Sequence, residues 1–195
     1  MNIYLLNGPP GCGKDTAGAM LANMLEGCTL KFAESLKEAT HRMLAGFVGN
    51  GIVPFDWDAY EDCKDAPNPD FFGVTPRQMY IAVSEKLLKP LLGHGFFGRE
   101  MALRIGALWD AGSVVITDCG FQEEVDALRD ALPDANYHLV RLRRKGCDFS
   151  ADSRGYIPNP GGTLAEIAND GSKADLRVML ADYLRLREAP QETTV

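Results

Sequence analysis

Short apolar runs and longer amphipathic stretches alternate along the chain. The apolar runs have the length and composition of β-strands, which are predicted over residues 3–7, 29–32, 114–117, 137–142 and 165–167. Apolar residues at helical spacing predict helices over residues 14–25, 35–47, 76–88, 97–111, 122–131 and 173–187. Strands that alternate with helices are typical of a parallel sheet with crossover helices. The pattern therefore predicts an α/β domain with a central parallel sheet flanked by helices.

The first predicted strand leads into a glycine-rich turn that fits the pattern G-x-x-x-x-G-K. Strand, turn and helix follow in the order that a phosphate-binding loop requires. Glycine adopts backbone angles that other residues avoid. The N–H groups of the turn can therefore point at phosphate oxygens, and the helix N-terminus adds its positive end. We expect the loop to bind ATP through Gly8, Pro9, Pro10, Gly11, Cys12, Gly13, Lys14, Asp15 and Thr16. A glycine-rich turn with a solvated lysine is the alternative.

Side chains at the end of the loop and at the end of a later strand bear on catalysis and on Mg²⁺. Lys14 can reach the β- and γ-phosphates as a mobile point charge. Ser or Thr usually follows the lysine and holds Mg²⁺, but here Asp15 follows it and Thr16 comes next. This order favours a metal contact through water, with Asp15 orienting the loop. Asp118 ends the strand at 114–117, where a carboxylate of such proteins holds Mg²⁺ directly or through water. Thr16 and Asp118 are therefore the candidate metal residues.

Two further positions are candidates for catalysis or acceptor binding. Glu34 follows the second predicted strand, at the edge where parallel strands form a ligand crevice. It could take a proton from an acceptor hydroxyl, and a helix-capping role is equally supported. Arg77 begins a helix and opposes its dipole, which suggests a role in binding a substrate phosphate. A surface ion pair is the alternative for Arg77.

Two irregular stretches interrupt the alternation of strands and helices. Residues 49–73 are rich in glycine, proline and acidic residues, and residues 145–162 are similar. Long irregular stretches are more often functional than idle. We expect one domain over residues 1–195, with an acceptor-binding insertion over about 49–98 and a lid over about 145–162. Ordinary surface loops are the alternative. Phosphoryl transfer needs positive charge over the transferred oxygens, and one or two of Arg141, Arg143, Arg144 and Arg154 are expected to supply it, with Arg143 and Arg154 counted among the catalytic candidates.

Bulk properties restrict the partners and the compartment. The net charge of −7 argues against broad nonspecific binding of nucleic acid, although the basic run at 141–145 leaves a local groove open. No apolar run has the length of a membrane span, and no basic-then-apolar leader opens the chain. The five cysteines lack metal-like spacing, which favours a reducing cytoplasm. The oligomeric state is left open, a homodimer included.

The chain resembles the deoxynucleoside-monophosphate kinases of tailed bacteriophages. The resemblance is carried by residues 8–16, 60–62 with 72–77, 115–124, and 152–157 with 167–172. It implies a P-loop NTPase fold of the nucleoside-monophosphate-kinase type, host cytoplasm as the location, and transfer of the γ-phosphate of ATP to a deoxynucleoside 5′-monophosphate. Lys14 would hold the donor, Arg77 the acceptor phosphate and Asp118 the Mg²⁺, while lid arginines close over the reaction. The family usually has Arg two residues after the strand Asp, where this chain has Gly120.

Two other functions fit the same motifs. Related phage kinases phosphorylate 5-hydroxymethyluracil in DNA. The acceptor is then a hydroxyl, for which Glu34 would suit as the base, and the basic run at 141–145 could grip the strand. A nucleotide-binding switch or assembly ATPase without a small acceptor is the third hypothesis, although the sequence offers no water-orienting residue for it. The expected partners are therefore a small nucleotide or modified DNA, and no membrane.

Overall fold

The computed structural model describes residues 1–47, 60, 62–108, 112–150 and 152–188. Its centre is a five-stranded sheet in the order β2-β3-β1-β4-β5. The strands are β1 (Asn2–Asn7), β2 (Cys28–Leu30), β3 (Ser113–Cys119), β4 (Asn136–Arg143) and β5 (Thr163–Ala168). Each neighbouring pair is parallel, and Ile3 of β1 lies between Val114 of β3 and Tyr137 of β4. The predicted parallel α/β sheet is confirmed.

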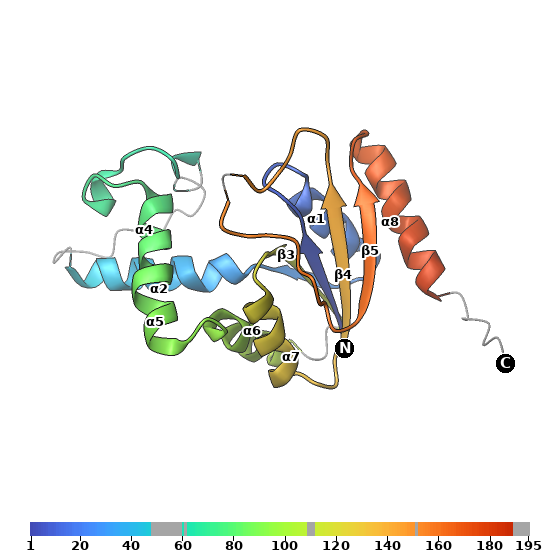
Figure 1. Ribbon diagram of the computed structural model, residues 1–195, viewed down its shortest axis with the longest axis horizontal. Coiled ribbons are helices and arrows are strands. Elements are labelled where there is room, and N and C mark those ends of the chain that lie inside the picture. Colours follow the sequence, from blue (N-terminus) through green and yellow to red (C-terminus); the bar gives the residue numbers. More distant parts are fainter. Residues whose placement is uncertain (48–59, 61, 109–111, 151, 189–195) are drawn as a thin grey trace.

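Helices connect these strands and cover both faces of the sheet (Figure 1). They are α1 (Lys14–Met24), α2 (Phe32–Phe47), α4 (Pro76–Val83), α5 (Lys89–Leu92), α6 (Phe96–Gly106), α7 (Gln122–Ala131) and α8 (Lys173–Glu188). The 3-10 turn η1 (Pro69–Phe71) precedes α4, and the π-helical turn η2 (Ser84–Leu88) joins α4 to α5. The helix predicted over 76–88 is therefore α4 continued by a π-turn. The predicted helix over 97–111 is α6, which ends at Gly106, and residues 109–111 lie outside the described residues.

The core has one layer on each face of the sheet. Along β1, Ile3 and Leu5 pack on one face with residues of α6 and α7. Tyr4 and Leu6 pack on the other face with residues of α1 and α8. Successive side chains of a strand point to opposite faces, so a strand that is covered on both sides reads as a continuous apolar run. This explains why the strands could be located from the sequence.

One predicted boundary is wrong at the end of β2. The strand predicted over 29–32 stops at Leu30, and the helix predicted from Ser35 begins at Phe32. The carboxylate of Asp118 accepts hydrogen bonds from the backbone N–H groups of Phe32 and Ala33. The first N–H groups of a helix have no acceptor within that helix. The Asp118 carboxylate supplies the missing acceptor, so α2 can begin at Phe32. Because Asp118 belongs to β3, the sequence around residue 32 does not indicate that a helix begins there.

Part of the predicted insertion, namely α4, η2 and α5, forms an arm together with α2, and this arm projects to one side of the sheet (Figure 1). A small core holds it together, in which Tyr60, Phe71 and Tyr80 pack as an aromatic cluster. His41 of α2 bonds through Nε2 to the Tyr80 hydroxyl of α4 at 2.7 Å. Residues 48–59 and 61 of the predicted insertion lie outside the described residues.

The lid segment, residues 145–162, lies against the carboxyl ends of the central strands. Asn7, the last residue of β1, is fully buried. Its amide nitrogen donates to the carbonyls of Cys119 and Gly155, both at 2.9 Å, and its amide oxygen accepts from the Ile157 N–H at 3.0 Å. Arg141 of β4 also donates to the Ile157 carbonyl. The lid segment is therefore attached to β1, β3 and β4 in this conformation.

All five cysteines are free thiols. Among the described helices, none combines the length and the hydropathy that crossing a bilayer requires.

Candidate active site

The glycine-rich loop follows β1 directly and ends at the first turn of α1, as predicted. Gly11 and Gly13 have φ values of 77° and 97°, a region that favours glycine. Space also requires glycine at position 13, because a Cβ there would lie 2.4 Å from the side-chain nitrogen of Asn169. That nitrogen donates to the Cys12 carbonyl at 2.8 Å. Asn169, which follows β5, therefore supports the loop from the far side.

The Lys14 side chain lies over the loop. Its Nζ donates to the carbonyls of Gly8 at 2.6 Å and Pro9 at 2.9 Å. Burial lowers the pKa of Lys14, and the charge of Arg154 contributes in the same direction. The guanidinium of Arg154 is thus close enough to act electrostatically on the ammonium group at the loop.

Asp15 follows the lysine and Thr117 lies on the neighbouring strand β3, which reverses the usual places of the hydroxyl and the carboxylate. The usual arrangement has Ser or Thr after the lysine and Asp on the neighbouring strand. Here Thr117 of β3 donates through Oγ1 to Oδ1 of Asp15 at 3.0 Å, and Lys31 contacts the same oxygen at 2.9 Å. Carboxylate and hydroxyl oxygens suit Mg²⁺. The carboxylate of Asp15 and the hydroxyl of Thr117, which the structure brings together, therefore fit this ion, while the metal role of Thr16 stays a prediction.

Asp118 points away from the loop and into a pocket. Both carboxylate oxygens accept backbone hydrogen bonds at the start of α2, at 2.8 and 2.9 Å. Burial raises the pKa of Asp118, and the two N–H groups lower it in part. The structure thus shows a capping role for Asp118, while its role as a metal residue stays a prediction from the sequence.

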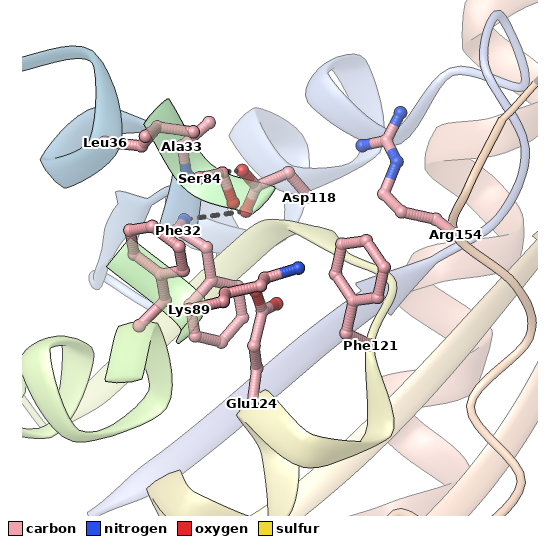
Figure 2. Close-up of a pocket in the computed structure, with 10 residues that line it drawn as sticks. Phe32, Ala33, Leu36, Ser84, Lys89, Asp118, Phe121, Glu124 and Arg154 are labelled. Carbon is pink, nitrogen blue, oxygen red and sulfur yellow. Dashed lines mark hydrogen bonds between the residues drawn. The ribbon is translucent and has the colours of Figure 1, made fainter. Parts of the chain in front are cut away.

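The pocket lies between the carboxyl end of β3, the arm and the lid segment (Figure 2). It encloses about 410 Å³, its open mouth included. Its walls are made of Phe32, Ala33, Leu36, Ser84, Lys89, Phe97, Asp118, Phe121, Glu124 and Arg154. Three aromatic rings thus surround two carboxyl groups and two cationic groups. Apolar pockets with a few convergent polar groups are the usual form of small-molecule sites.

Lys89 is a buried cation in this pocket. Its side chain is 6% exposed, and its Nζ donates to Oε1 of Glu85 at 2.6 Å. The same nitrogen lies 4.0 Å from the ring centroid of Phe121, a favourable arrangement for a desolvated cation. Sequence reasoning missed Lys89, because one Lys between Leu88 and Pro90 gives no signal of burial.

Glu124, in the first turn of α7, is a buried carboxyl that sequence reasoning also missed. It is 4% exposed, and burial raises its pKa to about 8, with a further increase from Asp118 and an opposing effect of Lys89. One signal could have found it. Glu124 lies one helical turn before the apolar Leu128, so both occupy the face that packs on the core.

This carboxyl should make stability depend on pH. From its ordinary value of 4.5 up to about 8, the folded protein keeps a proton that the unfolded chain has released, so stability falls as pH rises. Relative to Glu124→Gln, we expect the free energy of unfolding of the native protein to fall by about 2 kcal/mol between pH 5 and pH 7. Urea unfolding of both proteins at several pH values measures the difference. Parallel pH profiles would contradict the prediction.

Arg154 reaches the pocket from the lid segment. Its Nε and Nη2 donate to the two carboxylate oxygens of Asp152 at 2.9 and 2.6 Å. Its stem packs on Gly120, where an added Cβ would lie 2.6–2.7 Å from the Cβ, Cγ and Cδ of Arg154. Arg154 therefore occupies the space into which a side chain at position 120 would project. The Gly155 N–H donates to the Gly120 carbonyl at 3.1 Å and secures the contact.

The other predicted residues lie outside the pocket and are engaged in ion pairs. Glu34 pairs with Arg104 at 2.9 Å. Arg77 contacts both oxygens of Asp65, at 2.5 and 3.2 Å, with both side chains more than half exposed. Arg143 of β4 makes a two-pronged contact with Glu166 of β5, both distances being 2.9 Å. The structure thus brings Asp118 and Arg154 together, with Lys14 in electrostatic range of Arg154. Roles for Glu34, Arg77 and Arg143 stay predictions.

Solved structures share this fold, although the chain matches no model of a known protein family and no curated protein. A sugar kinase from Janibacter sp. HTCC2649 aligns over 95% of each chain with a TM-score of 0.51 and 12% identity. A protein from Chloroflexus aurantiacus J-10-fl aligns over 95% of this chain and 97% of its own, with a TM-score of 0.50 and 12% identity. The shikimate kinase from Aquifex aeolicus covers 96% of this chain and 98% of its own, at 12% identity and a TM-score of 0.47. The predicted fold, a parallel α/β sheet flanked by helices, is therefore shown, and the sugar kinase and the Chloroflexus protein share it.

Proposed function

We propose that the protein transfers the γ-phosphate of ATP to a small acceptor bound in the pocket. The observation that carries the proposal is the position of Arg154 between the two halves of the site. Its charge acts on Lys14 at the loop and on Asp118 and Glu124 in the pocket. A cation between donor and acceptor is what phosphoryl transfer requires. The sugar and shikimate kinases of similar fold, which are named for small-molecule acceptors, support the same class of reaction.

Donor and metal bind at the glycine-rich loop in this proposal. The loop N–H groups and the Lys14 ammonium hold the phosphates of ATP. Asp15 and Thr16 hold Mg²⁺, and bound there the ion offsets negative charge on the β- and γ-phosphates. Asp118 is assigned to positioning α2 and lining the pocket, because α2 already engages both of its oxygens.

The preferred acceptor is a deoxynucleoside 5′-monophosphate. The pocket is amphipathic in the way such a ligand requires, since Phe32, Phe97 and Phe121 offer apolar surface to a base. Arg154 supplies positive charge on the side of the lid and the loop, where the acceptor phosphate would meet the γ-phosphate. The sequence resemblance to phage deoxynucleoside-monophosphate kinases supports the same acceptor.

A hydroxyl acceptor such as 5-hydroxymethyluracil in DNA is the second candidate. The pocket carboxylate of Asp118 favours it, because a hydroxyl needs a base to accept its proton. The ion pairs of Arg141 and Arg143 with Glu166 speak against DNA, since they offset much of the basic run that could grip a strand.

Radiolabelled γ-phosphate transfer tests these alternatives directly. The acceptors are the four common deoxynucleoside monophosphates, free nucleosides, and DNA with or without 5-hydroxymethyluracil. Label on a monophosphate supports the first candidate, and label on the polymer supports the second. ATP hydrolysis without a labelled acceptor would contradict both and favour a nucleotide-binding switch.

Arg77→Ala should raise KM for a monophosphate acceptor about tenfold and leave KM for ATP within twofold. The Arg77–Asp65 pair is exposed, so it stabilises little, and an acceptor phosphate can displace Asp65 from the guanidinium. Steady-state kinetics with each substrate varied in turn gives both constants. Asp65→Ala is the matched control and should not raise KM for the acceptor. Equal changes in both constants for Arg77→Ala would remove this residue from the acceptor site.

A further inference from the structure

Glu124 differs from the other polar side chains of the pocket in having no partner in the protein. Lys89 and Ser84 both donate to Glu85. Asp118 accepts from the first turn of α2, and Arg154 is held by Asp152. Within the described residues, no hydrogen bond or ion pair involves the Glu124 carboxyl, although its side chain is 4% exposed.

An unpartnered buried carboxyl is costly, and a ligand can supply the missing partner. Largely buried polar groups without a hydrogen bond are rare unless they serve a purpose, and the Glu124 oxygens are not among the fully enclosed unpaired atoms of the described residues, so a ligand in the pocket can reach them. Figure 2 shows the carboxyl of Glu124 directed into the pocket, beneath Asp118 and beside the aromatic walls. The only side that remains open to this carboxyl, among the residues described, is the pocket itself.

We propose that the Glu124 carboxyl recognises the acceptor by pairing with the polar edge of a nucleobase inserted between the aromatic walls of the pocket. The inference rests on the proposed function, because it assigns the pocket to the acceptor. It adds the Glu124 carboxyl as the group that determines which acceptor binds. The transfer chemistry is carried by Lys14 and Arg154, so Glu124 is a specificity residue.

The protonation state of Glu124 determines what edge it can pair with. At neutral pH a pKa of about 8 leaves the carboxyl protonated. It then has one donor and one acceptor, which match a ring N–H beside a carbonyl, or a ring nitrogen beside an amino group. Above pH 8 it becomes acceptor-only and loses this match. The charged groups that act on it are Asp118 of β3, Lys89 of α5, Arg154 of the lid segment and Glu123 of its own helix.

Two variants at this position separate hydrogen bonding from charge. Glu124→Gln keeps one donor and one acceptor but does not titrate, so we expect an acceptor KM within threefold of the native value at pH 7. The native kcat/KM for the acceptor should fall about tenfold per pH unit above 8, and Glu124→Gln should lack this fall. Glu124→Ala should raise the acceptor KM at least tenfold without changing KM for ATP. Glu123→Gln, an exposed change in the same helical turn, is the matched control and should behave as the native protein.

A ligand change completes the test. The preferred acceptor is compared with its derivative methylated at the ring nitrogen of the base-pairing edge. The native protein should bind the methylated compound at least tenfold more weakly, and Glu124→Ala should bind both alike. An equal preference in both proteins, or an acceptor KM that neither substitution changes, would overturn the inference.

Calorimetric binding of the same compounds in the absence of ATP separates this inference from the proposed function. Binding that depends on Glu124 without any phosphate transfer would contradict the function and support the recognition role. Transfer that is indifferent to both Glu124 variants would contradict the recognition role alone. A protein that neither binds nor phosphorylates any of the bases would overturn both.

Discussion

Replacing Lys14 with alanine should lower kcat for phosphate transfer by at least about 10³-fold. The ammonium lies over the loop, 2.6 and 2.9 Å from the carbonyls of Gly8 and Pro9. From there a short movement of its flexible stem brings it to the β- and γ-phosphates. The same positive charge then opposes the negative charge that builds up as the bond to the γ-phosphate breaks.

The fold should tolerate this change, because the loop shape depends on Gly11, Gly13 and Asn169. Thermal unfolding should therefore shift by only a few degrees, since about 1 kcal/mol of hydrogen bonding is lost. Lys14→Arg is a demanding control. It keeps the charge, yet its planar fork does not fit a site built for a point charge, so activity should remain low. Turnover near the native rate in Lys14→Ala would refute the assignment of the donor site.

Arg154→Ala should lower kcat about 10³-fold, the effect typical of an arginine that stabilises charge on the transferred phosphate. The structure distinguishes Arg154 from Arg143, which the sequence left equivalent. Arg154 lines the pocket and acts on Lys14. Arg143 is exposed and paired with Glu166. Arg143→Ala is therefore the matched control, with kcat expected within threefold of the native value. Similar losses in both variants would mean that Arg143 of β4 and Arg154 of the lid segment contribute only diffuse positive charge.

Gly120 provides a second test of the same contact. A methyl group at this position would lie 2.6–2.7 Å from the stem of Arg154, so Gly120→Ala should displace the guanidinium without removing it. We expect kcat to fall while the acceptor KM changes less, because the pocket walls remain. Pre-steady-state measurements of labelled product separate this loss from slower product release. A native kcat in Gly120→Ala would place Arg154 outside the reaction.

The fold could be predicted from the sequence because its signals are local. Strands covered on both faces read as apolar runs, and the loop is defined by the spacing of Gly8, Gly13 and Lys14. The start of α2 could not be predicted, since its cap, Asp118, comes from a strand more than 80 residues away. Lys89 and Glu124 were missed for a related reason. Their burial depends on how α5 and α7 pack at the end of β3, and the sequence near each residue does not predict this packing.

A site residue can be predicted from the sequence most directly where one residue type does one job at one place in a motif, as for Lys14. Glu34 and Arg77 are candidates because each is a charged residue at a strand or helix end, and Arg143 is one because it lies beside the predicted lid. In the fold each has an oppositely charged neighbour in Arg104, Asp65 or Glu166. Whether a surface charge faces a ligand or a neighbour is decided by tertiary placement, and sequence spacing says little about it.

The side chain of Asn7 has a consequence for how this fold can change. One amide holds the end of β3 and two backbone groups of the lid segment, and the next residue in the chain begins the glycine-rich loop. The lid segment and the glycine-rich loop, to which we assign the donor, are thus both connected to one side chain at the end of β1. The arm is built around a separate aromatic core. Evolution can therefore alter the arm, and with it the proposed acceptor, without disturbing the proposed donor site.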